Sequence, residues 1–155
     1  MAKGGVMAKS VREAMTASVS SVSPSQSLAD AAEVMKREDV GSVPVVDEGR
    51  LVGIVTDRDI VTRAIAEQRN PQAVTVEEIA SQELVTVEPE LDLDEAVALM
   101  ARHKVRRLPV LEEGRLAGML AQADVALEAK ELKVGEMVEQ ISQPTRGFSK
   151  RAHGA

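Results

Sequence analysis

The sequence predicts a mixed α/β (α+β) fold built from two copies of one β-α-β-β-α unit. The first observation is an internal repeat, because residues 11–63 align with residues 76–128 at a constant offset of 65, with 17 identities in 53 positions and no gap. The second is hydrophobic patterning that indicates the same elements in the same order in both copies. One unit is too small to bury both faces of its sheet, so we expect the two to pack about a pseudo-twofold axis.

Each unit is expected to open with a short β-rich run, at 19–22 and at 84–87, that ends near a proline. Ser27 and Asp92 follow, and both residue types are favoured helix N-caps. The apolar residues after each cap recur at i, i+3, i+4 and i+7, which is the spacing of an amphipathic helix. The sequence therefore predicts a helix after each of these runs.

Two β segments and a closing helix complete each unit. The expected strands cover 42–46, 51–55, 108–111 and 116–120. Gly49 and Gly114 lie in the connections, where glycine readily adopts the positive φ of a tight hairpin turn. The closing helices are expected to start near Thr56 and Ala121.

The repeat also sets the expected organisation of the chain. The predicted regions are an N-terminal segment 1–10, a first motif 11–66, a linker 67–75, a second motif 76–131, a short C-terminal helix 132–141 and a basic tail 142–155. The linker contains Asn70-Pro71, which stops a helix. The tail has basic residues and no acidic one, so we expect a solvated, disordered end, with contact to an anionic partner as the alternative.

Composition excludes several classes of function. The chain has no Cys, which excludes disulfides, Cys-ligated zinc and thiol nucleophiles. It also has no Trp or Tyr, so we do not expect it to bind single-stranded nucleic acid by stacking bases on aromatic rings. The net charge of −6 disfavours nucleic acid as a partner. No apolar run approaches the roughly 18 residues of a membrane span, and the N-terminus lacks a signal-peptide core, so we expect a cytoplasmic protein without a membrane partner.

The segment VGSVPVVDEGRLVGIVTDRDI (40–60) and its partner VRRLPVLEEGRLAGMLAQADV (105–125) together resemble the CBS motif. The tandem pair resembles a CBS module, or Bateman domain, over roughly residues 8–130. Within that family the arrangement is most similar to free-standing actinobacterial two-CBS proteins of the hypoxic-response type. The resemblance implies binding of an adenosine-type nucleotide (AMP, ADP or ATP) in a cleft between the motifs, with no obligatory cofactor.

The resemblance also implies roles for the Gly-x-x-[Ser/Thr]-x-x-Asp segment. Thr56 matches the phosphate-contacting hydroxyl and Asp59 the carboxylate that binds the ribose hydroxyls. The second motif keeps Asp124 but has Ala121 in place of the hydroxyl residue, which puts a phosphate contact there in doubt. The alternative is structural, because Thr-x-x-Asp at a helix start also forms a capping box without any ligand.

Basic residues near the second motif supply further candidates. Arg106 and Arg107 stand where the first motif has Gly41 and Ser42, and the resemblance implies that this position faces a cleft, where an Arg could bind phosphate. The alternative is an exposed basic helix end, favoured by the helix dipole. Arg58 is a weaker phosphate candidate.

The one Phe, Trp or Tyr residue of the chain is Phe148 in the polar tail, so we expect any adenine base to lie between aliphatic side chains and proline. The candidates are Val43, Pro44, Ile54, Leu108, Pro109 and Met119. His103 is expected to belong to a helix end rather than to a metal site, since the other histidine is His153 in the tail. No catalytic triad or metal motif is visible, so catalysis is not expected.

Two functional hypotheses remain. The first is a regulatory sensor that binds a nucleotide and signals to a separate effector protein or through its oligomeric state. The second is a stress-associated homodimer whose clefts are empty or bind another ligand. Both predict a homodimer formed by apolar residues of the closing helices, such as Ile60, Ala64 and Val125. A nucleic-acid-binding role would need the basic tail to dominate an acidic body.

Overall fold

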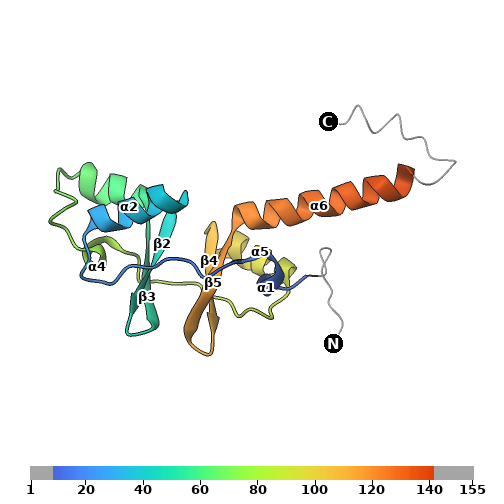
Figure 1. The fold of residues 1–155 in the computed structure, drawn as a ribbon, viewed down its shortest axis with the longest axis horizontal. Coiled ribbons are helices and arrows are strands. Elements are labelled where there is room, and N and C mark those ends of the chain that lie inside the picture. Colours follow the sequence, from blue (N-terminus) through green and yellow to red (C-terminus); the bar gives the residue numbers. More distant parts are fainter. Residues whose placement is uncertain (1–8, 142–155) are drawn as a thin grey trace.

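In the computed structural model, the backbone is described for residues 9–141 and the side chains for residues 9–132. Most of the predicted N-terminal segment, residues 1–8, and the predicted basic tail, residues 142–155, lie outside the described residues. Figure 1 shows two α+β halves side by side, with one long helix projecting from the second half. The mixed fold class predicted from the sequence is confirmed.

Each half contains the same four consecutive elements. The first half consists of α2 (Leu28–Glu38), β2 (Ser42–Asp47), β3 (Arg50–Thr56) and α3 (Asp57–Ile60), which continues into a π-helical turn, η1 (Val61–Ile65). The second half consists of α5 (Leu93–His103), β4 (Arg107–Glu112), β5 (Arg115–Ala121) and α6 (Gln122–Ile141). Three short elements precede these sets: α1 (Val11–Ala14), β1 (Thr16–Ala17) and α4 (Val76–Ile79).

The two β-hairpins meet to form one antiparallel sheet. Strand β2 pairs with β3, strand β4 pairs with β5, and the hairpins join where Arg50 pairs with its repeat counterpart Arg115. Both hairpin turns have positive φ at their two central residues, for example 52° at Glu48 and 83° at Gly49. This is the type I′ turn, whose twist suits a two-residue hairpin, and it explains the need for glycine.

The β-rich runs predicted at 19–22 and 84–87 do not form strands. Each makes a single parallel bridge, from Val22 to Val45 and from Val87 to Val110. The next hydrogen bond of a parallel ladder would need the N–H two residues later, which is Pro24 in one copy and Pro89 in the other. Because proline has no N–H, the pairing stops after one residue.

The short helices α1 and α4 are exchanged between the halves. The Val11 N–H donates to the Leu91 carbonyl at 2.8 Å, and the Val76 N–H donates to the Gln26 carbonyl at 2.7 Å, so each helix is anchored to the other copy of the repeat. Figure 1 shows α1 beside α5, with the chain crossing from there to the first half. The halves that pack together therefore differ from the sequence repeats 11–66 and 76–131.

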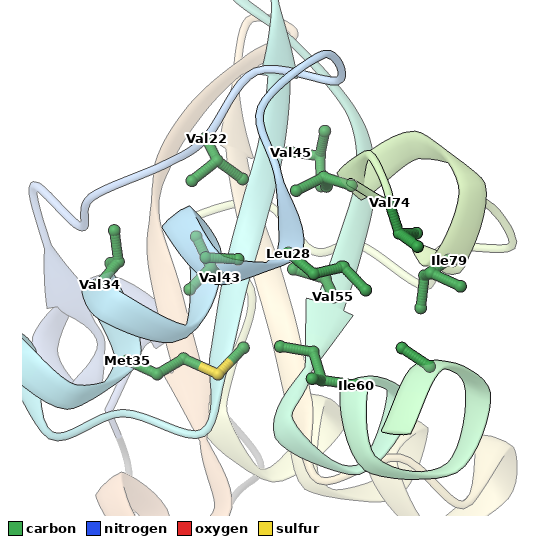
Figure 2. Packing of buried hydrophobic residues seen from close by; sticks show 13 residues of the cluster. Val22, Leu28, Val34, Met35, Val43, Val45, Val55, Ile60, Val74 and Ile79 are labelled. Carbon is green, nitrogen blue, oxygen red and sulfur yellow. The ribbon is translucent and has the colours of Figure 1, made fainter. Parts of the chain in front are cut away.

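Each half has its own hydrophobic core. In the first, apolar residues of α2, β2, β3 and α3 pack with Val74, Val76 and Ile79 of the exchanged segment, and Figure 2 shows most of this cluster. In the second, Val11 of α1 packs with buried residues of α5, β4 and β5. Since the core of each half includes residues of the other repeat, the halves are tied together by buried apolar surface.

Helix α6 differs from the prediction at the C-terminal side. It runs without a break from Gln122 to Ile141, across the boundary where the sequence suggested that the second motif ends at 131 and a separate helix covers 132–141. The physical reason is that this stretch has no proline and consists largely of strong helix formers. In the first half, by contrast, Asn70-Pro71 follows soon after η1 and ends the helical segment.

Candidate ligand-binding clefts

A cavity of about 640 Å³ lies between the two halves, where the end of β3 and the start of α3 face the start of β4. We call it the first cleft. The predicted site residues that line it are Ile54, Thr56, Arg58, Asp59, Arg106, Arg107 and Pro109. Residues from both motifs of the sequence repeat thus meet at one cavity.

Thr56 and Asp59 form a reciprocal capping box at the head of α3. The Asp59 N–H donates to Thr56 Oγ1 and the Thr56 N–H donates to Asp59 Oδ2, both at 3.0 Å. The structural interpretation of this pair is therefore correct. The cap does not use the whole carboxylate, because Oδ1 is a separate oxygen that lies 3.9 Å from Arg63 Nε. The capping box fixes the carboxylate at the cleft and leaves Oδ1 able to accept further hydrogen bonds.

Arg106 and Arg107 lie beyond the end of α5, on the way into β4, and both line the first cleft. Gly41 makes room for Arg107, since a methyl group at Gly41 would lie 2.5 Å from Arg107 Nη2. The same point lies 3.3 Å from Asp57 Oδ2, so the Arg107 guanidinium of the second half reaches the first half. His103, by contrast, lies in the last turn of α5, as expected.

A second cavity of about 420 Å³ lies at the equivalent place across the pseudo-twofold axis. We call it the second cleft, and it is lined by the predicted residues Pro44, Met119 and Asp124 together with Arg107. The Ala121 N–H donates to Asp124 Oδ2 at 2.8 Å, which is half of the capping box seen at α3. Ala121 has no hydroxyl to form the other half or to contact a phosphate.

Two predicted base-contacting residues are placed elsewhere. Val43 and Leu108 are both 0% exposed and belong to the first and second cores. Side chains alternate along a strand, so Pro44 and Pro109, although buried themselves, lie on the face toward the clefts and line them, while their neighbours pack in the cores and line neither cleft. The prediction of Val43 and Leu108 as ligand contacts is wrong for this reason.

The residues predicted to form a dimer interface are also turned inward. Ile60 is 8% exposed and Ala64 is 0% exposed, and both pack in the first core. Val125 is partly buried against the second core. The exposed apolar residues of this closing helix are instead Val61 and Ile65, with 56% and 52% of their surface accessible.

Several charged residues of the clefts were not predicted. Lys104, Arg63 and Glu83 line the first cleft, and Glu38 and Asp39 line the second. The position of Arg63 could have been inferred, because it lies four residues after Asp59 on the closing helix. Asp39 and Lys104 are counterparts in the repeat and directly precede the segments that carry the CBS resemblance, so their place next to those segments was the available signal.

The counterpart of Arg63 in the second half is Glu128, on α6. Lys9 Nζ lies 2.7 Å from Glu128 Oε1, and this hydrogen bond raises the pKa of Lys9 above its usual value. The carboxylate near the start of α6 is therefore paired with the N-terminal segment rather than directed to a ligand. The two halves differ in charge at this position.

The two clefts have opposite net charge. Within the part of the chain that the structure describes, the first cleft is lined by five basic and three acidic side chains, a difference of +2. The second is lined by one basic and three acidic side chains, a difference of −2. A cavity lined by excess positive charge attracts anions, so the first cleft has the electrostatics suited to a phosphate.

Other site types are not indicated by the described residues. Across residues 9–132, no three His, Asp or Glu side chains come close enough together to hold a metal ion. None of the helices described here combines the length and the apolar character that crossing a bilayer requires.

Two repeated α+β units with reciprocal contacts and paired clefts define a tandem-repeat module. A family model of the CBS domain matches residues 11–65 and 76–131. The chain therefore belongs to the CBS-domain family, as a tandem CBS protein of the hypoxic-response type.

The relatives agree with this placement. The chain is 44% identical over 118 residues to the CBS domain-containing protein YhcV of Bacillus subtilis, covering 76% of this chain and 84% of that protein. It is 35% identical over 134 residues to Hypoxic response protein 1 of Mycobacterium tuberculosis, covering 86% and 94%.

Two solved structures are also similar. Hypoxic Response Protein I, solved with two coordinated zinc ions, has a TM-score of 0.71 and 36% identity, with 77% of this chain and 98% of that chain covered. CBSX2, solved in complex with AMP, has a TM-score of 0.69 and 28% identity, with 80% and 98% covered.

Proposed function

We propose that this protein is a non-catalytic regulatory module that binds an adenosine-type nucleotide, AMP, ADP or ATP, in the first cleft and acts in the cytoplasm. The observation that carries the proposal is the pairing of Asp59 and Thr56 on one wall with Arg106 and Arg107 on the other, in a cavity lined by net positive charge. A CBS-domain neighbour solved with AMP supports the same ligand class.

Each part of such a nucleotide has a complementary group in the first cleft. Asp59 Oδ1 is available to accept hydrogen bonds from the ribose hydroxyls, because only Oδ2 is used by the cap. Thr56 Oγ1 accepts from a backbone N–H, so its own proton is free to donate to a phosphate oxygen. The guanidinium groups of Arg106 and Arg107 supply the planar donor fork that phosphate favours.

The base would lie between Ile54 of β3 and Pro109 of β4, which line the same cavity. With no Trp or Tyr in the chain, apolar contact and backbone hydrogen bonds would select the base in place of ring stacking. Because residues from both halves contact one ligand, occupancy would shift the packing of the halves. A separate effector protein or a change of oligomeric state would then carry the signal.

Calorimetric titration with AMP, ADP and ATP tests the proposal. We expect saturable binding that weakens about tenfold or more in Asp59→Ala, since a charged hydrogen-bond acceptor is lost. Arg106→Ala is a second variant, because Arg106 is exposed and its loss should not disturb folding. The matched control is Asp124→Ala, which removes the equivalent carboxylate from the other cleft.

No detectable heat with any of the three nucleotides would refute nucleotide binding. A cheaper observation is available because the chain has no Trp or Tyr and absorbs little in the near ultraviolet. A nucleotide that co-purifies with the protein should dominate its absorption spectrum.

A second candidate function is a homodimeric interaction protein, associated with stress, whose clefts hold no nucleotide. The observation that favours dimerisation is the exposure of Val61 and Ile65 on the outer side of the closing helix. Analytical ultracentrifugation should give a dimer for the wild type and a monomer for Val61→Glu. A dimer that binds no adenosine compound would favour this second function.

A further inference from the structure

The second cleft retains part of the first cleft's chemistry. Pro44 is the counterpart of Pro109, and Asp124 is the counterpart of Asp59, each at the same offset of 65. Both carboxylates are held in place by the backbone N–H three residues earlier. Val40, which also lines this cleft, has 44% of its surface exposed. The second cleft thus combines apolar surface with an acidic acceptor, an arrangement that suits a ligand with an apolar ring and hydroxyl groups.

The phosphate-binding features are the ones that the second cleft has lost. Thr56 is replaced by Ala121, as the sequence shows. Three basic residues have acidic or uncharged counterparts: Lys104 corresponds to Asp39, Arg58 to Ala123 and Arg106 to Gly41. The first cleft has a lysine where the second has an aspartate, so the charge at this position is reversed. The second cleft therefore lacks phosphate-binding groups and in addition carries a negative charge that repels phosphate.

The acidic residues of the second cleft are only partly compensated. Glu38 accepts a hydrogen bond from the Ser20 hydroxyl and lies 3.5 Å from Arg37 Nη2. Among the described residues, the pairs that lie within ion-pair distance include neither Asp39 nor Asp124. A phosphate that entered this cleft would face like charges, which is unfavourable.

Arg107 links the two clefts. It alone, among the described residues that line either cleft, lines both. A phosphate in the first cleft would attract the Arg107 guanidinium toward it. The second cleft would then be lined by carboxylates without a basic residue, so filling the first cleft makes the second still less favourable for an anion.

We propose that the second cleft takes an uncharged nucleoside of the adenosine class and rejects the nucleotide that the first cleft takes. One chain then holds a nucleotide and a nucleoside at the same time, with Arg107 as the residue that couples the two sites. This inference rests on the proposed nucleotide binding in the first cleft, and it adds the ligand class of the second.

The test uses AMP and adenosine as probes of the full chain in isothermal titration calorimetry. We expect one AMP per chain, and adenosine should still bind to protein that is already saturated with AMP. The adenosine signal should weaken about tenfold or more in Asp124→Asn, since the amide oxygen keeps the bond from the Ala121 N–H but loses the negative charge. AMP affinity should be unchanged in that variant.

A charge reversal provides the sharper variant. Asp39→Lys copies the lysine of the first cleft into the second, and both positions have left-handed backbone, with φ of 55° and 56°, so lysine is tolerated there. We expect a second AMP site to appear, with about a tenfold gain in affinity. The control is Glu33→Lys, which makes the same change in net charge on the exposed surface of α2 outside both clefts.

The outcomes separate the two proposals. No AMP binding at all would overturn the proposed function. One AMP per chain with no adenosine bound to the saturated protein would overturn the present inference alone. Two AMP molecules of similar affinity per wild-type chain would also overturn it, as would a second AMP site in Glu33→Lys equal to that in Asp39→Lys.

Discussion

The two halves of this protein share their packing and differ at their clefts. Leu28 and Leu93 are counterparts in the repeat, both fully buried, and Met35 and Met100 are likewise buried in both cores. At the clefts, however, Lys104 corresponds to Asp39. The duplicated unit therefore keeps every core position apolar and several core side chains unchanged, while the residues that give each cleft its charge have diverged.

The comparison teaches that side-chain volume limits substitution in the core, whereas side-chain charge determines the function of a cleft. A core position tolerates little change in volume, because the surrounding side chains are close-packed. A cleft position faces open space, where a change of charge costs little stability but changes which ligand is attracted. The equivalence of the cores and the divergence of the clefts can be tested separately.

The largest expected effect comes from the equivalent core leucines. Leu28→Ala and Leu93→Ala should each lower the free energy of unfolding by about 3–5 kcal/mol, because both side chains are 0% exposed. Chemical denaturation measures both values. Since the exchanged helices join the cores, each variant should still unfold in one transition, and two separate transitions would contradict that picture.

The exchanged helices give the next largest effect. Val11→Ala should cost about 2 kcal/mol and loosen the second half, because Val11 packs there although it belongs to the first repeat. Val76→Ala should do the same to the first half. Hydrogen exchange of α2 and α5 distinguishes the halves, and loss of protection within the repeat that carries the substitution would contradict the exchange.

Helix α3 begins with a complete capping box and α6 with half of one, which allows two reciprocal substitutions with a smaller expected effect. Thr56→Ala should destabilise the protein by about 1 kcal/mol, and Ala121→Thr should stabilise it by about 0.5–1 kcal/mol by completing the box with Asp124. Thermal melts measure both changes. Ala121→Thr should not by itself bring AMP into the second cleft, where the acidic lining remains, and a clear gain of AMP binding would contradict the electrostatic account.

The smallest effect is a pH dependence at α4. Hydrogen bonds from the Thr75 N–H and hydroxyl, with Arg69 beside them, lower the pKa of Glu78 from 4.5 to about 2. The folded state therefore holds the proton less tightly than the unfolded state, so this stabilisation is present above pH 4.5 and lost as the pH falls toward 2. Glu78→Gln should show a shallower fall in melting temperature across this range.

The control for that experiment is Glu77→Gln, which removes the adjacent carboxylate and leaves the Thr75–Glu78 capping box in place. It should keep the pH dependence of the wild type. Equal slopes for the wild type and Glu78→Gln would show that this capping box contributes nothing to acid sensitivity.

Much of the fold could be predicted because each local sequence pattern occurs twice, once in each copy of the repeat. Ser27 caps α2 through its side chain, Asp92 occupies the N-cap position of α5 without a side-chain capping hydrogen bond, and the hairpin glycines lie where the patterns indicated. The exchange of α1 and α4 could not be predicted, since it depends on contacts between residues far apart in the sequence. Such contacts produce no periodic pattern in the local sequence. The helices themselves had a signal, because Ser10-x-x-Glu13 is a capping-box pattern that the structure confirms.

The candidate site could be predicted where a motif marks it and not where the fold brings distant residues together. Asp59 and Thr56 carry the motif, and the structure brings them to one cavity with Arg106. Val43 was wrongly included, since a strand sends adjacent residues to opposite faces and the sequence alone left the cleft face undetermined.

The central claim is that the first cleft binds a nucleotide through groups from both halves. A crystal structure of the protein grown with AMP tests this most directly. We expect the ribose hydroxyls within hydrogen-bond distance of Asp59 Oδ1 and the phosphate beside Arg106 and Arg107. AMP bound only in the second cleft, or crystals grown at saturating AMP with neither cleft filled, would contradict the account.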